Sequence, residues 1–240
     1  MRTIVTLPTY NEAENIEDLI RELRALDAEV LVADDNSPDG TWKLVEALAA
    51  TDEGVRLLRR MEKKGRGYAG AEAFTAALEW GADRVIEMDA DFSHHPKFIP
   101  DLLAALEKGA DIVVGSRLVP GGQDVGRGRL REGLTKFSAW YARTILGLPI
   151  RDCNSGYRAY TRRALEAIAP ATLVSAGPSI VHEVFGRAKR AGLRVVEVPI
   201  VFVDRERGES ELTLGRLLDG FFKVWRVRAM MRELPERKED

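Results

Sequence analysis

The sequence predicts an α/β fold with a mainly parallel, twisted sheet flanked by helices, in the Rossmann-like layout of nucleotide-binding proteins. Short apolar runs alternate with segments of helical periodicity through about residue 117. Strand–helix–strand units are right-handed and cover both faces of a sheet, so this alternation favours parallel strands. Polar clusters follow several of the runs, where open α/β sheets bind their ligands.

Each element is expected from its own pattern. Strands are predicted at 3–7, 28–35, 54–59, 84–89 and 111–117, and helices at 13–26, 39–50, 68–80 and 96–108. Pro8 is expected to end the first strand, and Pro96 to open a helix. The glycine-rich stretch at 64–70 follows the third strand without the spacing of a dinucleotide fingerprint, so a flexible loop is expected there.

Composition narrows the class of protein. The chain has 240 residues, of which 45% are hydrophobic and 31% charged, as in a globular protein with a sizeable core. The net charge of −2 gives no general case for nucleic-acid binding. Cys153 is the sole cysteine, which suits a reducing cytoplasm. There is no signal-peptide pattern, and no apolar run approaches the roughly 20 residues that span a bilayer.

Four polar loops are expected to meet in one crevice, because each follows a predicted parallel strand. They read PTYNE, DDNSPDG, DADFSHHP and GSRLVPGG in chain order. Each has a structural interpretation by itself: Asp39, for example, could cap a helix, and Asp34 could serve its own loop. Their common position in the fold makes a shared ligand site the better interpretation.

A family resemblance is carried by six sequence blocks: PTYNE, DDNSPDGT, MDAD with a following HP, GSRLVPGG, DCNSGYR and EVPIVFVDRERGES. In this order they resemble the polyprenol-phosphate (dolichol-phosphate) mannose synthases, which are inverting glycosyltransferases of the GT-A type. The resemblance covers residues 3 to 215. It implies a GT-A catalytic domain at 1–211, which is followed by an amphipathic helix and charged tail at 212–240. Within the catalytic domain, residues 1–117 would form a nucleotide-binding half, and residues 118–211 would form an acceptor half with a donor lid.

The resemblance implies a divalent cation, Mg²⁺ or Mn²⁺, at the donor diphosphate. Asp89 and Asp91 are the expected ligands, because side chains two apart in an extended segment point to the same side. The neighbouring His94 and His95 are expected to lead into the next helix and not to coordinate zinc. A glutamine that some relatives place at Ser93 is missing, so serine or water would fill that position.

The other site residues follow from the same resemblance. Catalysis is assigned to Asp91, Arg117, Arg131 and Asp152, with Arg129 left open between a phosphate contact and a solvated face. Asp152 could orient the sugar or position an arginine. Pro8, Tyr10 and Glu12 would border the nucleoside, Asp35 would bind it, and Ala33 would offer backbone near the base. The full substrate-binding set is Pro8, Tyr10, Glu12, Ala33, Asp35, Asp89, Ala90, Asp91, Arg117, Arg131, Arg205 and Ser210.

The lid departs from the family pattern at one position. Relatives carry a lysine after the serine that matches Ser210, and here Glu211 stands in its place. An acidic side chain there would repel a diphosphate unless it points outward or a neighbour such as Arg207 substitutes. Hence donor affinity and lid closure are the expectations most affected.

Membrane contact is expected from two helices. In residues 212–234 basic side chains interleave with aromatic and aliphatic ones, which is typical of an interfacial helix and equally of a helix that closes the core. The segment 134–148 is the second candidate for a membrane-facing helix. The chain is therefore expected to be cytoplasmic and peripheral at the membrane, with a separate membrane-protein partner as an option.

The expected reaction is transfer of mannose from GDP-mannose to a polyprenyl phosphate, with inversion and release of GDP. UDP-glucose or another nucleotide sugar remains open as the donor, as does a different acceptor. A third hypothesis is a nucleotide-sugar-binding protein without turnover, suggested by Glu211.

Overall fold

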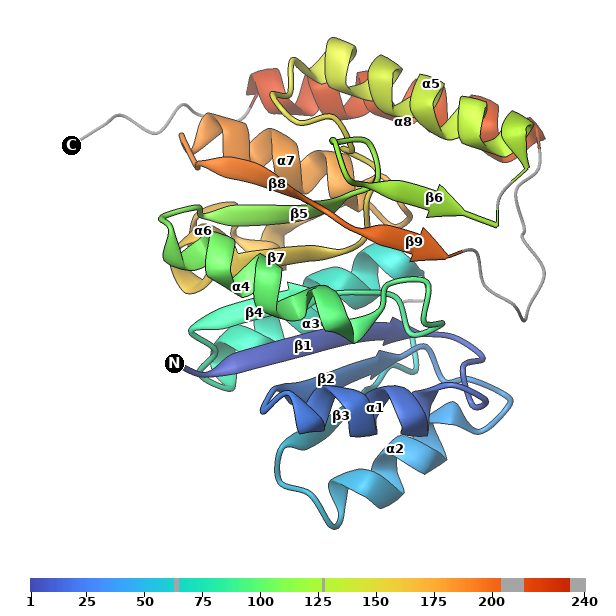
Figure 1. The fold of residues 1–240 in the computed structure, drawn as a ribbon, viewed down its shortest axis with the longest axis vertical. Helices are drawn as coiled ribbons and strands as arrows, with labels where there is room; N and C mark the ends of the chain where they lie inside the picture. The colour runs from blue at the N-terminus through green and yellow to red at the C-terminus, as the bar shows by residue number, and fades with distance from the viewer. Residues whose placement is uncertain (63–64, 127, 204–213, 234–240) are drawn as a thin grey trace.

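The computed structural model of the protein describes residues 1–62, 65–126, 128–203 and 214–233. A seven-stranded sheet runs through it in the order β3-β2-β1-β4-β7-β5-β8 (Figure 1). Its strands are β1 (Thr3–Thr9), β2 (Glu29–Asp34), β3 (Val55–Arg59), β4 (Arg84–Glu87), β5 (Ile112–Ser116), β7 (Arg158–Thr161) and β8 (Val195–Pro199). All neighbouring pairs are parallel except those of β7, which runs antiparallel between β4 and β5. The predicted mainly parallel α/β fold is confirmed.

Helices cover both faces of the sheet. One face carries α1 (Ile16–Ala25), α2 (Thr41–Ala49) and α4 (Ile99–Glu107), the last preceded by the 3₁₀ turn η1 (Pro96–Phe98). The other carries α3 (Arg66–Glu79), α5 (Arg129–Leu146), α6 (Arg162–Ile168), α7 (Ile180–Arg190) and α8 (Leu214–Glu233), with the turn η2 (Pro170–Thr172). The two helix layers bury separate hydrophobic clusters, because alternate residues of each strand face opposite sides.

The first strand, β1, packs against both helix layers. In β1, Val5 and Leu7 join the cluster under α1, whereas Ile4 joins the opposite cluster. Pro8 does not end this strand, as the sequence suggested: it is in register with Ala33 of β2. On its other side, β1 pairs with β4 only as far as Thr6. The sheet therefore loses no hydrogen bond because Pro8 lacks an N–H.

Two short strands lie beside the main sheet. β6 (Gln123–Val125) and β9 (Val201–Val203) pair in parallel and hold the segment after β5 next to the segment after β8. Helices α5 and α8 lie side by side at the top of Figure 1, and both contact α7 of the same layer. The side chains of Val224, Val227 and Met231 are buried in the main core, so α8 closes that core along part of its length.

Candidate active site

The candidate site lies at the edge of the sheet where β1, β2, β4 and β5 end. Because these strands are parallel, their following loops meet at one edge. β7 runs the opposite way, so the loop that precedes it, with Asp152 and Gly156, arrives at the same edge. Alternation of strands and helices alone could not show this, since it predicts no antiparallel strand in the middle of the sheet.

Asp89 and Asp91 stand directly after β4. The strand ends at Glu87 and the following residues form a bend, with Phe92 at a φ of 59°. The strand expected at 84–89 therefore ends two residues early, before Asp89. Asp89 Oδ1 accepts a hydrogen bond from Arg66, and the charges of both aspartates act on Arg66 and on His94. The bend is closed by Asp91, whose Oδ1 accepts hydrogen bonds from Ser93 N at 3.1 Å and Ser93 Oγ at 2.5 Å.

The two histidines have structural partners. His94 is buried, and its Nδ1 accepts a hydrogen bond from the backbone N–H of Asp89 at 3.1 Å. Burial lowers the pKa of His94 to about 4, despite the nearby charges of Asp89 and Asp91. The imidazole is therefore neutral at physiological pH. His95 accepts from the N–H of Lys97 at 3.3 Å and caps the turn that Pro96 opens, so it leads into the helix.

Arg66 contacts Asp89 at this edge of the sheet, and the sequence did not indicate this contact. The stretch expected to be a loop at 64–70 instead begins helix α3 at Arg66. Gly65 precedes it with a φ of +126°, and a Cβ there would lie 2.7 Å from Ala176 O, so this turn requires glycine. From the first position of α3, the guanidinium of Arg66 donates to Asp89 Oδ1. In the sequence, only the presence of a cationic residue in a glycine-rich turn could have indicated this contact.

Arg117 and Asp152 form a buried ion pair. Arg117 donates from Nε and Nη2 to the two carboxylate oxygens of Asp152 at 2.7 and 2.8 Å, and its backbone N–H donates at 3.1 Å. Burial tends to lower the pKa of Arg117, but its hydrogen bond to Asp152 and the Asp152 charge raise it overall. Asp152 is itself oriented by Glu197, which accepts its N–H at 2.9 Å. Asp152 is fully buried, and both of its carboxylate oxygens contact Arg117.

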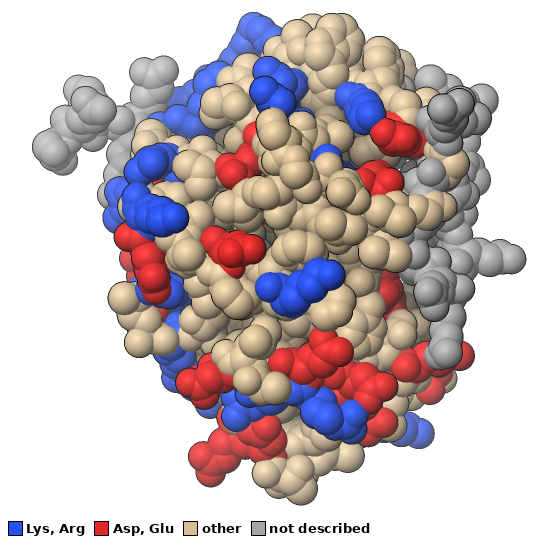
Figure 2. Space-filling view, viewed as in Figure 1, with Lys and Arg blue, Asp and Glu red and all other residues tan. Residues whose placement is uncertain are grey.

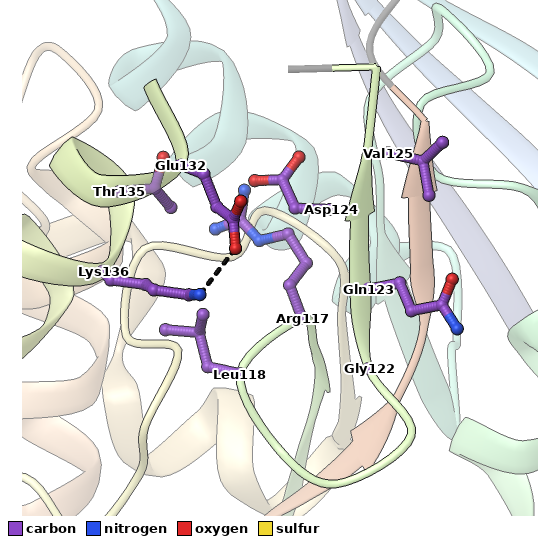
Figure 3. A pocket seen from close by; sticks show the side chains of 9 residues that line it. All are labelled: Arg117, Leu118, Gly122, Gln123, Asp124, Val125, Glu132, Thr135 and Lys136. Carbon is purple, nitrogen blue, oxygen red and sulfur yellow. Dashed lines mark hydrogen bonds and ion pairs between the residues drawn. The ribbon is translucent and has the colours of Figure 1, made fainter. Parts of the chain in front are cut away.

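A pocket opens beside Arg117. It has a volume of about 320 Å³, and Figure 3 shows the Arg117 side chain extending into it between α5 and β6. Lys136 and Glu132 of α5 line the same pocket and are joined at 2.5 Å. A second, more open groove of about 560 Å³ shares Arg117 and runs to Trp140. Its other lining residues include the cations Lys136, Arg143 and Arg151.

On the β2 side, both oxygens of Asp35 have partners. Oδ1 accepts from Arg60, and Oδ2 accepts from the N–H of Gly65 at 2.7 Å. Asp34 serves its own loop, as expected, by accepting from Ser37 N and Thr9 Oγ1 at 2.8 Å each. Asp35 thus connects the end of β2 to the start of α3.

The remaining expected contacts differ in their accessibility. Tyr10 is 54% exposed at the end of β1. Glu12 accepts from the Asn15 side chain at 3.1 Å near the start of α1, and Pro8 is half-buried. Ala33 at 0% and Ala90 at 2% exposure offer almost no surface to a ligand in this structure. The expected residues Arg205 and Ser210, and the side chain of Arg131, lie outside the described residues.

An aromatic cluster joins α5 and α8. It consists of Phe137, Trp140 and Tyr141 on α5 and Trp225 on α8, whose Nε1 donates to Tyr141 Oη at 2.8 Å. Phe137, Trp140 and Trp225 are 49%, 57% and 51% exposed. Figure 2 shows Lys and Arg side chains gathered toward the top of the view, where α5 and α8 lie. None of the helices in the described parts of the chain is long and apolar enough to span a bilayer.

The oxygen ligands at β4 fit a hard cation that is shared with a phosphate ligand. Over the described ranges, no group of three or more His, Cys, Asp or Glu side chains is arranged to hold a metal ion. A closed zinc site would need such a group. Mg²⁺ commonly takes one or two carboxylates and completes its shell with substrate phosphates and water, and Asp89 with Asp91 offers that donor set.

Comparison with known proteins identifies the family of this chain. The model of the glycosyl transferase family 2 matches residues 4–169, and the chain belongs to this family. It is 41% identical over 228 residues to an undecaprenyl-phosphate mannosyltransferase of Micrococcus luteus, covering 94% of this chain and 93% of the relative. A polyprenol monophosphomannose synthase of Mycolicibacterium smegmatis is 39% identical, over 96% of this chain and 89% of its own.

Solved structures show the same fold at lower identity. A glucosyl-3-phosphoglycerate synthase of Mycobacterium tuberculosis, in complex with Mn²⁺, UDP-glucose and glycerol 3-phosphate, superimposes with a TM-score of 0.69. It is 22% identical, over 98% of this chain and 81% of the other. The GT-A type of fold expected from the sequence is thereby confirmed.

Proposed function

We propose that the protein transfers mannose from GDP-mannose to a polyprenyl phosphate with inversion, giving polyprenyl-phosphate mannose and GDP. The observation that carries this proposal is the likeness, over nearly whole chains, to two transferases named for mannose and a polyprenyl phosphate. The placement of a carboxylate pair and a fixed arginine at one sheet edge supports it.

The donor side would be built by the loops after β1, β2 and β4. Tyr10 and Asp35 would contact the nucleoside, with Pro8, Glu12, Ala33 and Ala90 shaping the surroundings. Asp89 and Asp91 would hold Mg²⁺ or Mn²⁺, which would neutralise the charge that develops on the leaving diphosphate. Arg205 and Ser210 are proposed to complete the phosphate contacts.

The acceptor requires orientation and no strong base. A phosphate monoester has a second pKa of about 6, so one of its oxygens is an anionic nucleophile at neutral pH. That oxygen forms the new bond to the anomeric carbon as the bond to the GDP oxygen breaks, and this single displacement inverts the centre. Arg117, held by Asp152, would orient the acceptor phosphate together with Arg131 and reduce its repulsion from the donor.

The lipid would approach along the groove that leads from Arg117 to Trp140. Its cations Lys136, Arg143 and Arg151 suit a phosphate, and the groove ends at the aromatic cluster. Exposed aromatic rings beside basic residues are typical of surfaces that rest at a membrane interface. We therefore propose peripheral attachment through α5 and α8, on the cytoplasmic face.

A donor panel tests the proposal. Purified protein is mixed with a short polyprenyl phosphate, Mg²⁺ or Mn²⁺, and radiolabelled GDP-mannose, UDP-glucose or GDP-glucose, and lipid-linked label is counted. We expect product from GDP-mannose, with the opposite anomeric configuration by NMR. Product from UDP-glucose alone would overturn the mannose assignment. Absence of lipid product with every donor would overturn the enzyme assignment.

A further inference from the structure

We propose that Arg66 is a built-in counter-cation for Asp89, which occupies the place of the divalent cation in the metal-free protein and turns to the donor diphosphate when metal and donor bind. This inference rests on the proposed function, because it takes Asp89 as a metal ligand. It adds a positioning residue that couples the binding of the metal to the binding of the donor.

The geometry places the guanidinium where a cation would approach Asp89. Arg66 Nη1 donates to Asp89 Oδ1. A Cβ built on Gly156 would lie 2.7 Å from Arg66 Nη2 and 3.5 Å from Asp89 Oδ2, so the guanidinium and the carboxylate meet over this glycine. The two side chains are 30% and 25% exposed, which leaves their contact open to ions from solvent.

The surrounding charges explain why a cation is needed there. Glu87, Asp89 and Asp91 all act electrostatically on Arg66. Glu87 is 1% exposed and pairs with the fully buried Arg158, whereas Asp89 pairs with Arg66. A divalent cation between Asp89 and Asp91 would perform the same neutralisation. Because two cations at one carboxylate repel each other, the metal and the guanidinium compete for Asp89.

Only the side chain of Arg66 is free to make this change. Its backbone neighbours are fastened: Gly65 N donates to Asp35 Oδ2 at 2.7 Å, and Gly67 N donates to Ala176 O at 3.0 Å. Gly67 is packed so closely that a Cβ would lie 1.9 Å from Ser175 O. A long side chain on this fixed turn can leave Asp89 and reach a diphosphate bound beside it, and guanidinium groups bind phosphate in a bidentate manner.

A direct consequence is positive coupling between the two ligands. Metal alone must compete with Arg66, so its affinity for the free protein is reduced. A nucleoside diphosphate offers the displaced guanidinium a new partner and thereby restores the metal affinity. Removal of the Arg66 charge should therefore strengthen binding of metal alone and reduce the gain that the diphosphate provides.

The test measures Mn²⁺ binding without turnover. Free Mn²⁺ is titrated by electron paramagnetic resonance with wild type, Arg66→Gln, Arg66→Met and Arg66→Lys, with and without GDP. We expect the Arg66→Gln and Arg66→Met variants to bind Mn²⁺ alone about fivefold more tightly than wild type does, which is the scale of a partly exposed ion pair. The tightening by GDP should shrink in both variants. Arg66→Lys keeps the positive charge and should bind Mn²⁺ alone as weakly as wild type. The matched control is Arg163→Gln, which removes an ion pair with Asp111 elsewhere in the fold.

Thermal melting provides a second readout. Without metal, Arg66→Gln should melt below wild type, because Asp89 loses its ion pair with Arg66. Mn²⁺ should raise the melting temperature of this variant by a larger amount than that of wild type. Equal Mn²⁺ affinity in wild type and the Gln and Met variants overturns the inference, while lipid-linked mannose formation would leave the proposed function intact. Failure of Mn²⁺ to bind wild type even with GDP would instead remove the metal site on which both rest.

Discussion

Arg117 is clamped by Asp152 through three hydrogen bonds, from Nε at 2.7 Å, Nη2 at 2.8 Å and the backbone N–H at 3.1 Å. Phe202 lies against the same guanidinium, with 5.2 Å between the guanidinium carbon and the ring centroid. The side chains of Arg117 and Asp152 are 7% and 0% exposed. The arginine therefore presents its remaining N–H groups in a fixed direction, which suits the recognition of a phosphate.

Asp152→Asn should loosen this clamp and leave a buried positive charge without its counter-charge. We expect a loss of about 3 kcal/mol in the free energy of unfolding, as for other broken buried ion pairs. The KM for polyprenyl phosphate should rise more than the KM for the donor, since Arg117 is proposed to hold the acceptor. Urea unfolding and initial rates check the two expectations. Asp18→Asn, at the exposed pair with Arg21, is the control and should change both little.

Asp91→Asn removes one of the two charges proposed to hold the metal. Transfer should fall by at least about 100-fold, the usual scale for the loss of one group that stabilises transition-state charge. The Mn²⁺ concentration that gives half-maximal rate should rise. Both values come from initial rates measured across a Mn²⁺ series. Because the asparagine keeps an oxygen for the Ser93 contacts, the melting temperature should stay close to wild type. Undiminished transfer would exclude Asp91 from the site.

His182 should make folding stability depend on pH. Burial, with a smaller contribution from the Arg158 charge, lowers the pKa of His182 to about 4. The unfolded chain has a histidine pKa of about 6.5, so it binds the proton that the folded protein rejects. Stability from this group is therefore complete above about pH 6.5 and is lost as pH falls toward 4, with a slope of at most ~1.4 kcal/mol per pH unit.

His182→Gln tests this dependence and keeps a donor for Asn154 Oδ1, which lies 2.8 Å from His182 Nε2. Urea unfolding between pH 4 and 7 should show a reduced slope in the variant. Some slope should remain, because burial also lowers the pKa of His94 to about 4. A variant with the full wild-type slope would contradict the assignment to His182.

Phe137→Ser and Trp140→Ser should weaken attachment to membranes. Both side chains are about half exposed on α5, so their loss should cost little folding stability. Binding to vesicles containing anionic lipid, measured by co-sedimentation, should drop about tenfold for the double variant because burial of apolar rings in the interface is lost. Leu26→Ser, 41% exposed at the end of α1, is the matched control and should bind as wild type. Equal binding by all three proteins would move the membrane contact elsewhere.

Short-range patterns determined much of the fold. Several strands of the first half are recognisable because each is an apolar run that is buried on both faces. In β2, for example, Val30 and Val32 pack into one hydrophobic cluster and Leu31 into the opposite one. The aspartates after β4 and the arginine after β5 also follow from sequence, because the ends of parallel strands meet at one edge. The turn before α3 could not be predicted from the local sequence. Its glycines are required by close packing against residues 175 and 176, which lie more than 100 positions away.

The sequence by itself thus determined the class of fold, the family blocks and the chemical character of the site. Only the tertiary structure decided which charges meet. Arg66 and Asp89 are 23 positions apart, and Arg117 and Asp152 are 35 apart, across a sheet into which β7 inserts in the opposite direction. Local periodicity reports which face of an element is buried. The pairing of charged side chains depends on strand order and on desolvation at the sheet edge, which only the folded chain establishes.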